Sequence, residues 1–374
     1  MKARLILTVL AFAFCAGARQ APVAVLTPRQ GSWEEFTPQA TRVDGRWIDP
    51  TCSDAPGVIG LSLLGAPRWP DRLVIFFAGG GAAWNDITCS VPRLANGRPE
   101  TASTPPSCTQ TTIQRFSGMF DLSNPNNPVR DWSFIYVPYC TGDVHSGSNT
   151  ATYTDPDTGE PFTIQHRGAD NFRIILRWAE ENFRRPARIL VAGSSAGAYG
   201  AATHYARIRS TFPRGQAAFI GDAGQGVMTG NCSPCAWHYD VPRSLFDRSP
   251  PTINDDLVAR LAERYPNDRF AQFTTAHDYT QTAFYALMGG ENACRTWTEK
   301  MTHDLSAREE ASNFRAYVAA GQMHTILRSP AFYSETSGGE PFAVWFHALV
   351  ERGAQGWETQ VTQDSAAPAR TCPF

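Results

Sequence analysis

Short apolar segments recur along the chain, and each is followed by a glycine-rich or polar turn. Their β-branched and aromatic residues are typical of buried strands. These segments run from Arg72 to Phe77, Ser133 to Val137, Ala187 to Ala192, Ala217 to Ile220, Phe270 to Thr275 and Phe314 to Ala319. Because the apolar residues are continuous rather than alternating, we expect parallel strands that are covered on both faces.

Helical patterns lie between these segments. From Asp170 to Phe183, apolar residues recur at spacings of three and four, which predicts a helix with one buried face. Ala196 to Thr211 predicts a second helix, whose small residues allow close packing on the sheet. The stretch from Trp84 to Pro128 predicts a long irregular excursion, of a kind that is usually functional or held by disulfides. Together these elements predict an α/β fold: a mostly parallel sheet with helices on both faces.

Composition agrees with a folded protein that has a large core. Of 374 residues, 42 % are hydrophobic and 18 % are charged, which is too little charge for intrinsic disorder. The 33 basic and 35 acidic residues give no basic excess, so we expect no nucleic-acid partner.

The first residues have the pattern of an export signal. Lys2 and Arg4 precede an apolar run that ends at Cys15, and Ala16-Gly17-Ala18 follows. This pattern predicts a signal peptide over residues 1–18 and a secreted or periplasmic protein. The run is shorter than the roughly 20 residues of a membrane-spanning helix, so we expect no membrane span. Lipidation at Cys15 is an alternative, but the bulky Phe14 stands where a small residue is expected.

Cysteine usage also favours export. The chain has nine cysteines, and Cys15 belongs to the predicted signal peptide. The other eight are disulfide candidates: Cys52, Cys89, Cys108, Cys140, Cys232, Cys235, Cys294 and Cys372. An even number in an exported chain predicts up to four disulfides, whose connectivity the sequence leaves open. Cys232 and Cys235 have the spacing of a redox pair or half a zinc site, but no second ligand pair accompanies them. We therefore expect structural disulfides, with no metal and no cofactor.

Residues 193–197 read Gly-Ser-Ser-Ala-Gly and lie between a predicted strand and a predicted helix. In that position, G-x-S-x-G forms a sharp turn that presents the central serine, here Ser195, as a nucleophile. The alternative is an ordinary turn whose serine caps the helix.

A serine nucleophile needs a base and an acid that orients the base. Asp278 and His324 each follow a predicted strand, which gives the order Ser, Asp, His of an α/β-hydrolase. Asp222 is the alternative acid, although it follows the strand directly after that of the nucleophile. The alternative bases are His277, His303 and His347.

Gly79-Gly80-Gly81 follows the first predicted strand, where an α/β-hydrolase places backbone N–H groups against the oxyanion. Gly81, Ala82 and Ala196 are the expected donors. Trp84 is a candidate for the wall of the substrate pocket or for the core, and Tyr139 is a second candidate for the pocket.

Four segments resemble the pectin acetylesterase family, which includes the animal carboxylesterase Notum. They are residues 76–84 (FFAGGGAAW), 137–145 (VPYCTGDVH), 193–197 (GSSAG) and 278–281 (DYTQ). The resemblance implies an α/β-hydrolase fold and metal-independent deacylation of oxygen esters. It places the nucleophile at Ser195, the acid at Asp278 and the base at His324, and it adds Gly80 to the oxyanion segment. Ala83 stands where relatives commonly carry a cysteine, so family disulfide pairings cannot be copied wholesale.

The leading functional hypothesis is a secreted serine esterase that removes acyl groups, with acetyl favoured, from a carbohydrate such as pectin. The alternatives are a broader carboxylesterase or polyester depolymerase on the same triad, or a catalytically silent glycan-binding protein. Because one sheet must bring the triad and the oxyanion segment together, we expect residues 19–374 to form a single catalytic domain. We expect it to be a monomer.

Overall fold

The computed structural model describes residues 33–36, 38–53, 61–64, 71–90, 117–183, 185–229, 237–242 and 256–362. The predicted signal peptide and four of the disulfide candidates (Cys108, Cys232, Cys235 and Cys372) lie outside these residues. So does most of the predicted excursion between Trp84 and Pro128.

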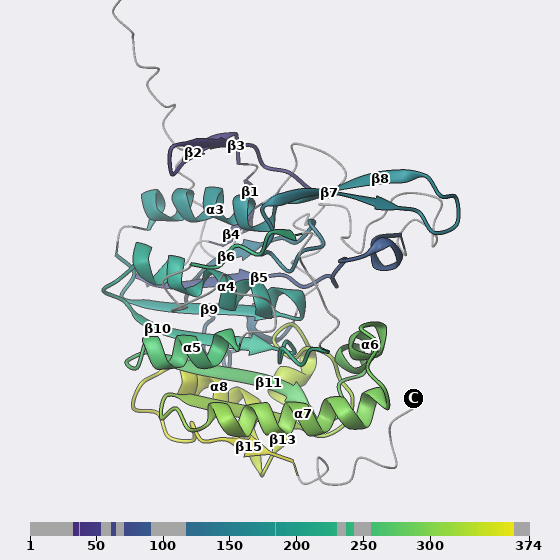
Figure 1. The fold of residues 1–374 in the computed structure, drawn as a ribbon. Coiled ribbons are helices and arrows are strands. Elements are labelled where there is room, and N and C mark those ends of the chain that lie inside the picture. Colours follow the sequence, from purple (N-terminus) through teal and green to yellow (C-terminus); the bar gives the residue numbers. More distant parts are fainter. Residues whose placement is uncertain are drawn as a thin grey trace, which may run out of the picture.

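Within the described residues, nine strands form one sheet (Figure 1). Their order across the sheet is β1 (Trp33–Phe36), β4 (Leu61–Leu64), β6 (Ser133–Val137), β5 (Arg72–Phe77), β9 (Arg188–Ser194), β10 (Gln216–Asp222), β11 (Arg269–Thr275), β12 (Phe314–Ala319) and β15 (Gln360–Val361). From β6 to β15 neighbouring strands are parallel, whereas β1 and β4 pair antiparallel at one edge. All six strands expected from the sequence are present, and the α/β-hydrolase fold class is confirmed.

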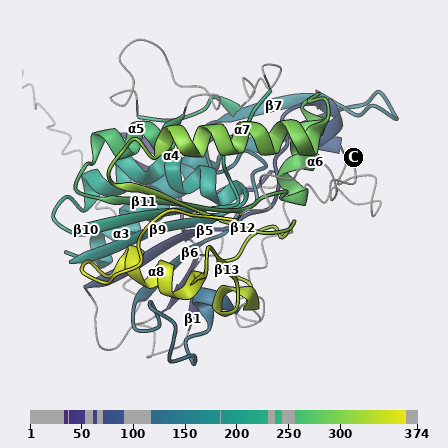
Figure 2. The same ribbon diagram turned by 90° about the horizontal axis from the view of Figure 1, so that it is seen from below.

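Helices cover both faces of this sheet (Figure 2). Successive side chains of a strand point to opposite faces, so Leu73, Ile75 and Phe77 enter one core and Val74 and Phe76 the other. The first core is closed by α3 (Gly168–Asn182), α4 (Ala196–Thr211), α5 (Leu257–Arg264) and α7 (Ala293–Arg308). The second is closed by α8 (Phe342–Val350) and the short 3-10 helices η1 (Gly118–Phe120) and η4 (Pro330–Tyr333).

Smaller elements surround the sheet. Antiparallel pairs form between β2 (Thr41–Val43) and β3 (Arg46–Ile48), β7 (Asn149–Thr154) and β8 (Pro161–His166), and β13 (Thr336–Ser337) and β14 (Glu340–Pro341). Helix α6 (Tyr279–Leu287) follows β11 directly. No helix in the described part of the chain is long and apolar enough to cross a membrane.

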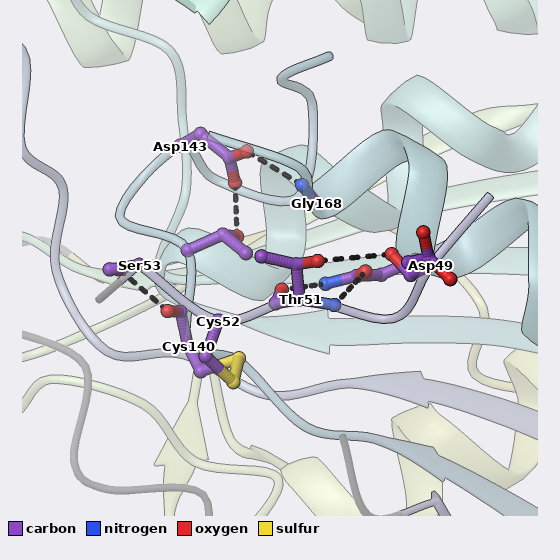
Figure 3. Close-up of a disulfide and its surroundings, with 9 residues drawn as sticks. Asp49, Thr51, Cys52, Ser53, Cys140, Asp143 and Gly168 are labelled. Carbon is purple, nitrogen blue, oxygen red and sulfur yellow. Dashed lines mark hydrogen bonds between the residues drawn. A yellow bond between two sulfur atoms is a disulfide. The ribbon is translucent and has the colours of Figure 1, made fainter. Parts of the chain in front are cut away.

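One disulfide lies close to the carboxyl ends of the parallel strands. Cys52 and Cys140 are bonded, and they join the segment after β3 to the loop after β6 (Figure 3). The hydroxyl of Ser53 donates a 2.7 Å hydrogen bond to the carbonyl of Cys140 beside it. Cys294 is disulfide-bonded as well. These disulfide candidates therefore behave as expected.

The expectation for Cys89 was wrong, because this residue is a free and buried thiol. It packs in a small apolar cluster with Ala83, Tyr153, Phe162 and Ile164, between the loop after β5 and the β7–β8 pair. A cysteine in such surroundings serves as a small apolar side chain. Counting cysteines could not distinguish this role from that of a disulfide partner.

Candidate active site

The G-x-S-x-G segment forms a strained turn between β9 and α4. Ser195 is the residue before α4 and has φ 57° and ψ −126°. A positive φ is unfavourable for a residue that carries a side chain, and such strain persists only where neighbouring structure enforces it. The turn lies at the carboxyl end of the sheet, as predicted for a nucleophile.

Steric crowding requires glycine at both glycine positions of the segment. A Cβ atom at Gly193 would lie 2.0 Å from the carbonyl oxygen of Gly197, and one at Gly197 would lie 2.0 Å from the carbonyl oxygen of Phe77. No side chain fits at such distances. The end of β5 can therefore approach the turn only because both positions are glycine.

Asp278 and His324 meet beside this turn. Asp278 precedes α6 and is fully buried, and His324 follows β12. The Nδ1 atom of His324 lies 3.0 and 2.9 Å from the two carboxylate oxygens of Asp278. The carboxylate also accepts hydrogen bonds from the backbone N–H and the side-chain amide of Gln281. These contacts fix both the carboxylate and the plane of the imidazole ring.

The second ring nitrogen of His324 remains available. Among the described residues, Nε2 of His324 is buried and has no hydrogen-bond partner. Ser195 and His324 line one pocket. A histidine that is held through Nδ1, has no partner on Nε2 and lines the same pocket as a serine is arranged to accept a proton.

The alternative acid and base residues have other contacts. The Asp222 carboxylate binds the side chain of Ser194 and the N–H groups of Ile326 and Leu327, rather than a histidine ring. His277 contacts the hydroxyl of Thr298 on α7. His303 and His347 lie within α7 and α8.

The pocket holds about 550 Å³ of empty space, part of it open to solvent. Besides Ser195 and His324, most of its lining is apolar. The remaining lining residues are Gly81, Ala82, Trp84, Val144, Ala196, Tyr199, Ala223, Met228, Trp237, Thr280, Gln281, Phe284 and Met288.

Three of the four oxyanion candidates line this pocket, namely Gly81, Ala82 and Ala196. No hydrogen bond within the described residues uses the N–H of Gly81 or Ala82. Ala196 begins α4, so its N–H has no partner within the helix. All three amides are thus candidates to bind a charged oxygen, whereas Gly80 does not line the pocket.

Comparison with protein families agrees with this arrangement. The pectinacetylesterase family model matches residues 65–228, which contain the glycine loop after β5 and the G-x-S-x-G turn. This part of the chain is therefore similar to the pectinacetylesterase family. Asp278 and His324 lie beyond the matched residues, so their assignment rests on geometry.

Comparison with solved structures shows a similarity in fold that reaches beyond residues 65–228. Two crystal forms of the Wnt deacylase Notum from Drosophila superpose with TM-scores of 0.61 and 0.62 at 16 % identity. Each comparison covers 91 % of this chain and 100 % of the Notum chain. At this identity the likeness concerns the fold. No curated protein gives a significant match to the sequence.

The expectation that Tyr139 lines the pocket was wrong. Its side chain is 6 % exposed, and its hydroxyl accepts a 2.8 Å hydrogen bond from the N–H of Val144. Tyr139 therefore supports a pocket residue from behind, and Val144 forms the wall. Trp84 does line the pocket, where its ring lies 6.1 Å from that of Phe284.

Sequence reasoning missed the contribution of α6 to the pocket. Thr280, Gln281, Phe284 and Met288 all line it. Gln281, Phe284 and Met288 are spaced three and four residues apart, and Thr280 adjoins Gln281, so the four lie on one helix face. A helix placed after Asp278 would have revealed them.

A buried histidine that sequence reasoning left without a role supports the glycine loop. Nε2 of His145 lies 2.8 Å from the carbonyl oxygen of Ala78, directly before the three glycines. Burial lowers the pKa of His145 to about 4, so the ring is neutral at physiological pH and donates from Nε2. Asp143 holds the next turn through the N–H groups of His145, Gly147 and Gly168, the last of which Figure 3 shows.

Proposed function

We propose that this protein is a serine esterase whose triad is Ser195, His324 and Asp278. The observation that carries the proposal is the strained Ser195 turn in the same pocket as a histidine that is held by a buried aspartate. The match of residues 65–228 to the pectinacetylesterase family model supports ester hydrolysis as the reaction class.

In the proposed reaction, Nε2 of His324 takes the proton of the Ser195 hydroxyl as the serine oxygen attacks the ester carbonyl. The carbonyl oxygen becomes an oxyanion, which the N–H groups of Gly81, Ala82 and Ala196 bind. His324 returns the proton to the leaving alcohol, and an acyl-enzyme forms. Water then attacks this ester with His324 as base, which releases the carboxylic acid and restores Ser195.

The proposed substrate is an acylated carbohydrate such as pectin, with acetyl as the favoured acyl group. The family supports this choice, since it is named for deacetylation of pectin. We further propose export of a monomer after removal of a signal peptide, and the Cys52–Cys140 disulfide fits an oxidising compartment.

The apolar lining of the pocket favours a second candidate, a broader carboxylesterase. Phe284, Met228 and Met288 offer more apolar surface than an acetyl group needs, and apolar walls favour longer acyl chains. The similarity in fold to a Wnt deacylase is a further reason to test acyl groups other than acetyl.

Labelling and hydrolysis test the proposal together. A fluorophosphonate should label the purified protein at Ser195, and Ser195→Ala should abolish both labelling and ester hydrolysis while the protein stays folded. Acetate release from acetylated polysaccharides, set beside a series of p-nitrophenyl esters of increasing chain length, separates the two candidates. A folded Ser195→Ala variant with wild-type activity would rule out the triad.

A further inference from the structure

Asp222 lies at the carboxyl end of β10 and is fully buried. Its carboxylate accepts a 2.6 Å hydrogen bond from the hydroxyl of Ser194. It also accepts from the N–H groups of Ile326, at 2.9 and 3.1 Å, and Leu327, at 3.0 Å. Its backbone carbonyl accepts the N–H of Ser195 at 2.7 Å. One residue thus contacts two segments that are far apart in sequence.

Each of these segments carries one partner of the proposed proton transfer. Ser194 directly precedes the nucleophile, and Ile326 is two residues beyond His324. Thr325, between them, has φ 70°, a left-handed conformation that is strained for a β-branched residue. The carboxylate binds the two N–H groups that follow this strained residue, so it restrains the turn that presents His324.

Among the described residues, hydrogen bonds rather than an arginine hold the carboxyl group of Asp222. No ion pair among the described residues includes Asp222. Burial raises the pKa of its carboxyl group to about 6, although its hydrogen bonds and the charge of His324 act to lower that pKa. Asp268 offers a contrast, because it is also buried but pairs with Arg209 and accepts from the hydroxyl of Tyr205. The Asp222 carboxylate therefore depends on the hydrogen bonds from the two segments and on the charge of His324.

We propose that Asp222 is a positioning residue that sets the distance between Ser195 and His324 by holding the two segments on one carboxylate. The inference rests on the proposed function, because it assigns a role within that triad. Asp222 acts through backbone and Ser194 contacts alone, and Asp278 remains the acid that orients the histidine.

The test compares Asp222→Asn with Asp268→Asn as a matched control. An asparagine retains one acceptor oxygen but turns an NH₂ group toward donors that the carboxylate had accepted from. A displacement near 1 Å costs on the order of 100-fold in rate, so we expect kcat to fall about 10- to 100-fold. The rate of fluorophosphonate labelling should fall in parallel, while KM stays near the wild-type value because the pocket lining is intact. Asp268 directly precedes β11, at the end of the strand away from the pocket. Asp268→Asn should therefore lower the stability of the protein, because it breaks the ion pair with Arg209, but it should leave kcat per folded molecule unchanged.

Ser194→Ala keeps the test decisive if Asp222→Asn does not fold. It removes one of the hydrogen bonds and leaves the carboxylate in place, and we expect a smaller fall in kcat, again without a change in KM. Unchanged kcat in either folded variant would overturn the inference, as would losses that follow only the folded fraction. The wild-type protein serves as the control for the proposed function. If that function is wrong, the fluorophosphonate will not label Ser195 of the wild type; if the wild type is labelled, the variants test the role of Asp222 alone.

Discussion

Nδ1 of His324 lies 2.9 Å from Oδ2 of Asp278, although the two residues are 46 positions apart in sequence. Each residue follows its own strand, and β11 and β12 are neighbours in the sheet. Parallel pairing brings the carboxyl ends of the two strands to the same edge, so the aspartate and the histidine meet there. The contact leaves Nε2 directed away from the carboxylate.

This contact predicts a large catalytic effect of Asp278→Asn with little effect on folding. An asparagine NH₂ group would face Nδ1 and favour the tautomer that carries its proton on Nε2, which then cannot act as a base. In the serine protease triad this change lowers kcat about 10⁴-fold, and we expect a loss of similar order in p-nitrophenyl acetate hydrolysis. Asp268→Asn is the control, and a loss of less than tenfold in Asp278→Asn would contradict the assignment.

The close approach of β5 to the serine turn predicts that Gly197→Ala destabilises the fold. The added Cβ atom would lie 2.0 Å from a backbone oxygen, which cannot move aside as a side chain can. Overpacking typically costs 1–3 kcal/mol, and here we expect about 3 kcal/mol or more in equilibrium denaturation. Gly221→Ala is the matched control, because its Cβ atom would approach nothing closer than 3.3 Å. Equal losses in the two variants would argue against this reading.

The Cys52–Cys140 disulfide should contribute substantially to stability. It joins residues 88 positions apart, and removal of a native disulfide typically costs about 2–5 kcal/mol because the unfolded chain gains freedom. We expect the Cys52→Ala, Cys140→Ala double variant to lose this amount in urea denaturation. Each single variant should lose at least as much as the double variant, since it also leaves an unpaired thiol. A double variant as stable as the wild type would contradict the expectation.

The free thiol of Cys89 should resist alkylation in the native protein. Burial raises its pKa to about 12, so only about one molecule in 10⁴ carries the reactive thiolate at pH 8. Iodoacetamide should leave Cys89 unmodified until the protein is denatured, as peptide mass spectrometry can measure. Rapid modification under native conditions would show that the cluster around Cys89 opens.

The buried carboxyl group of Asp222 predicts a specific dependence of stability on pH. Its pKa rises from the ordinary 3.8 to about 6 in the folded protein, so the folded state binds the proton more tightly than the unfolded state does. This contribution stabilises the fold below about pH 4 and is lost as pH rises through about 6. The difference corresponds to about 3 kcal/mol.

Asp222→Asn lacks this proton and supplies the comparison. The free energy of unfolding of the wild type, minus that of the variant, should decrease between about pH 4 and pH 6 and level off above it. Urea denaturation of both proteins at several pH values measures the difference. A difference that stays constant, or that increases with pH, would show that the carboxyl group keeps an ordinary or a lowered pKa in the folded state.

Local patterns in the sequence determined the central strands, the helix after Ser195 and the chain order of the candidate triad. Runs such as Arg72–Phe77 are buried on both faces, and this continuous apolar character is visible without any knowledge of the neighbouring strands. The glycines at 193 and 197 likewise mark a turn through their own conformational and steric properties. These features depend on residues that are adjacent in the chain.

Only the tertiary structure decided which of the two aspartates contacts the histidine and which residues line the pocket. Asp222 and Asp278 both follow strands of the same sheet, and the direction of each carboxylate depends on the course of the loop after it. Cys89 and Tyr139 were misjudged for the same reason, because their roles depend on which distant side chains surround them. Such contacts join segments that are remote in sequence, and no local pattern of apolar and polar residues records them.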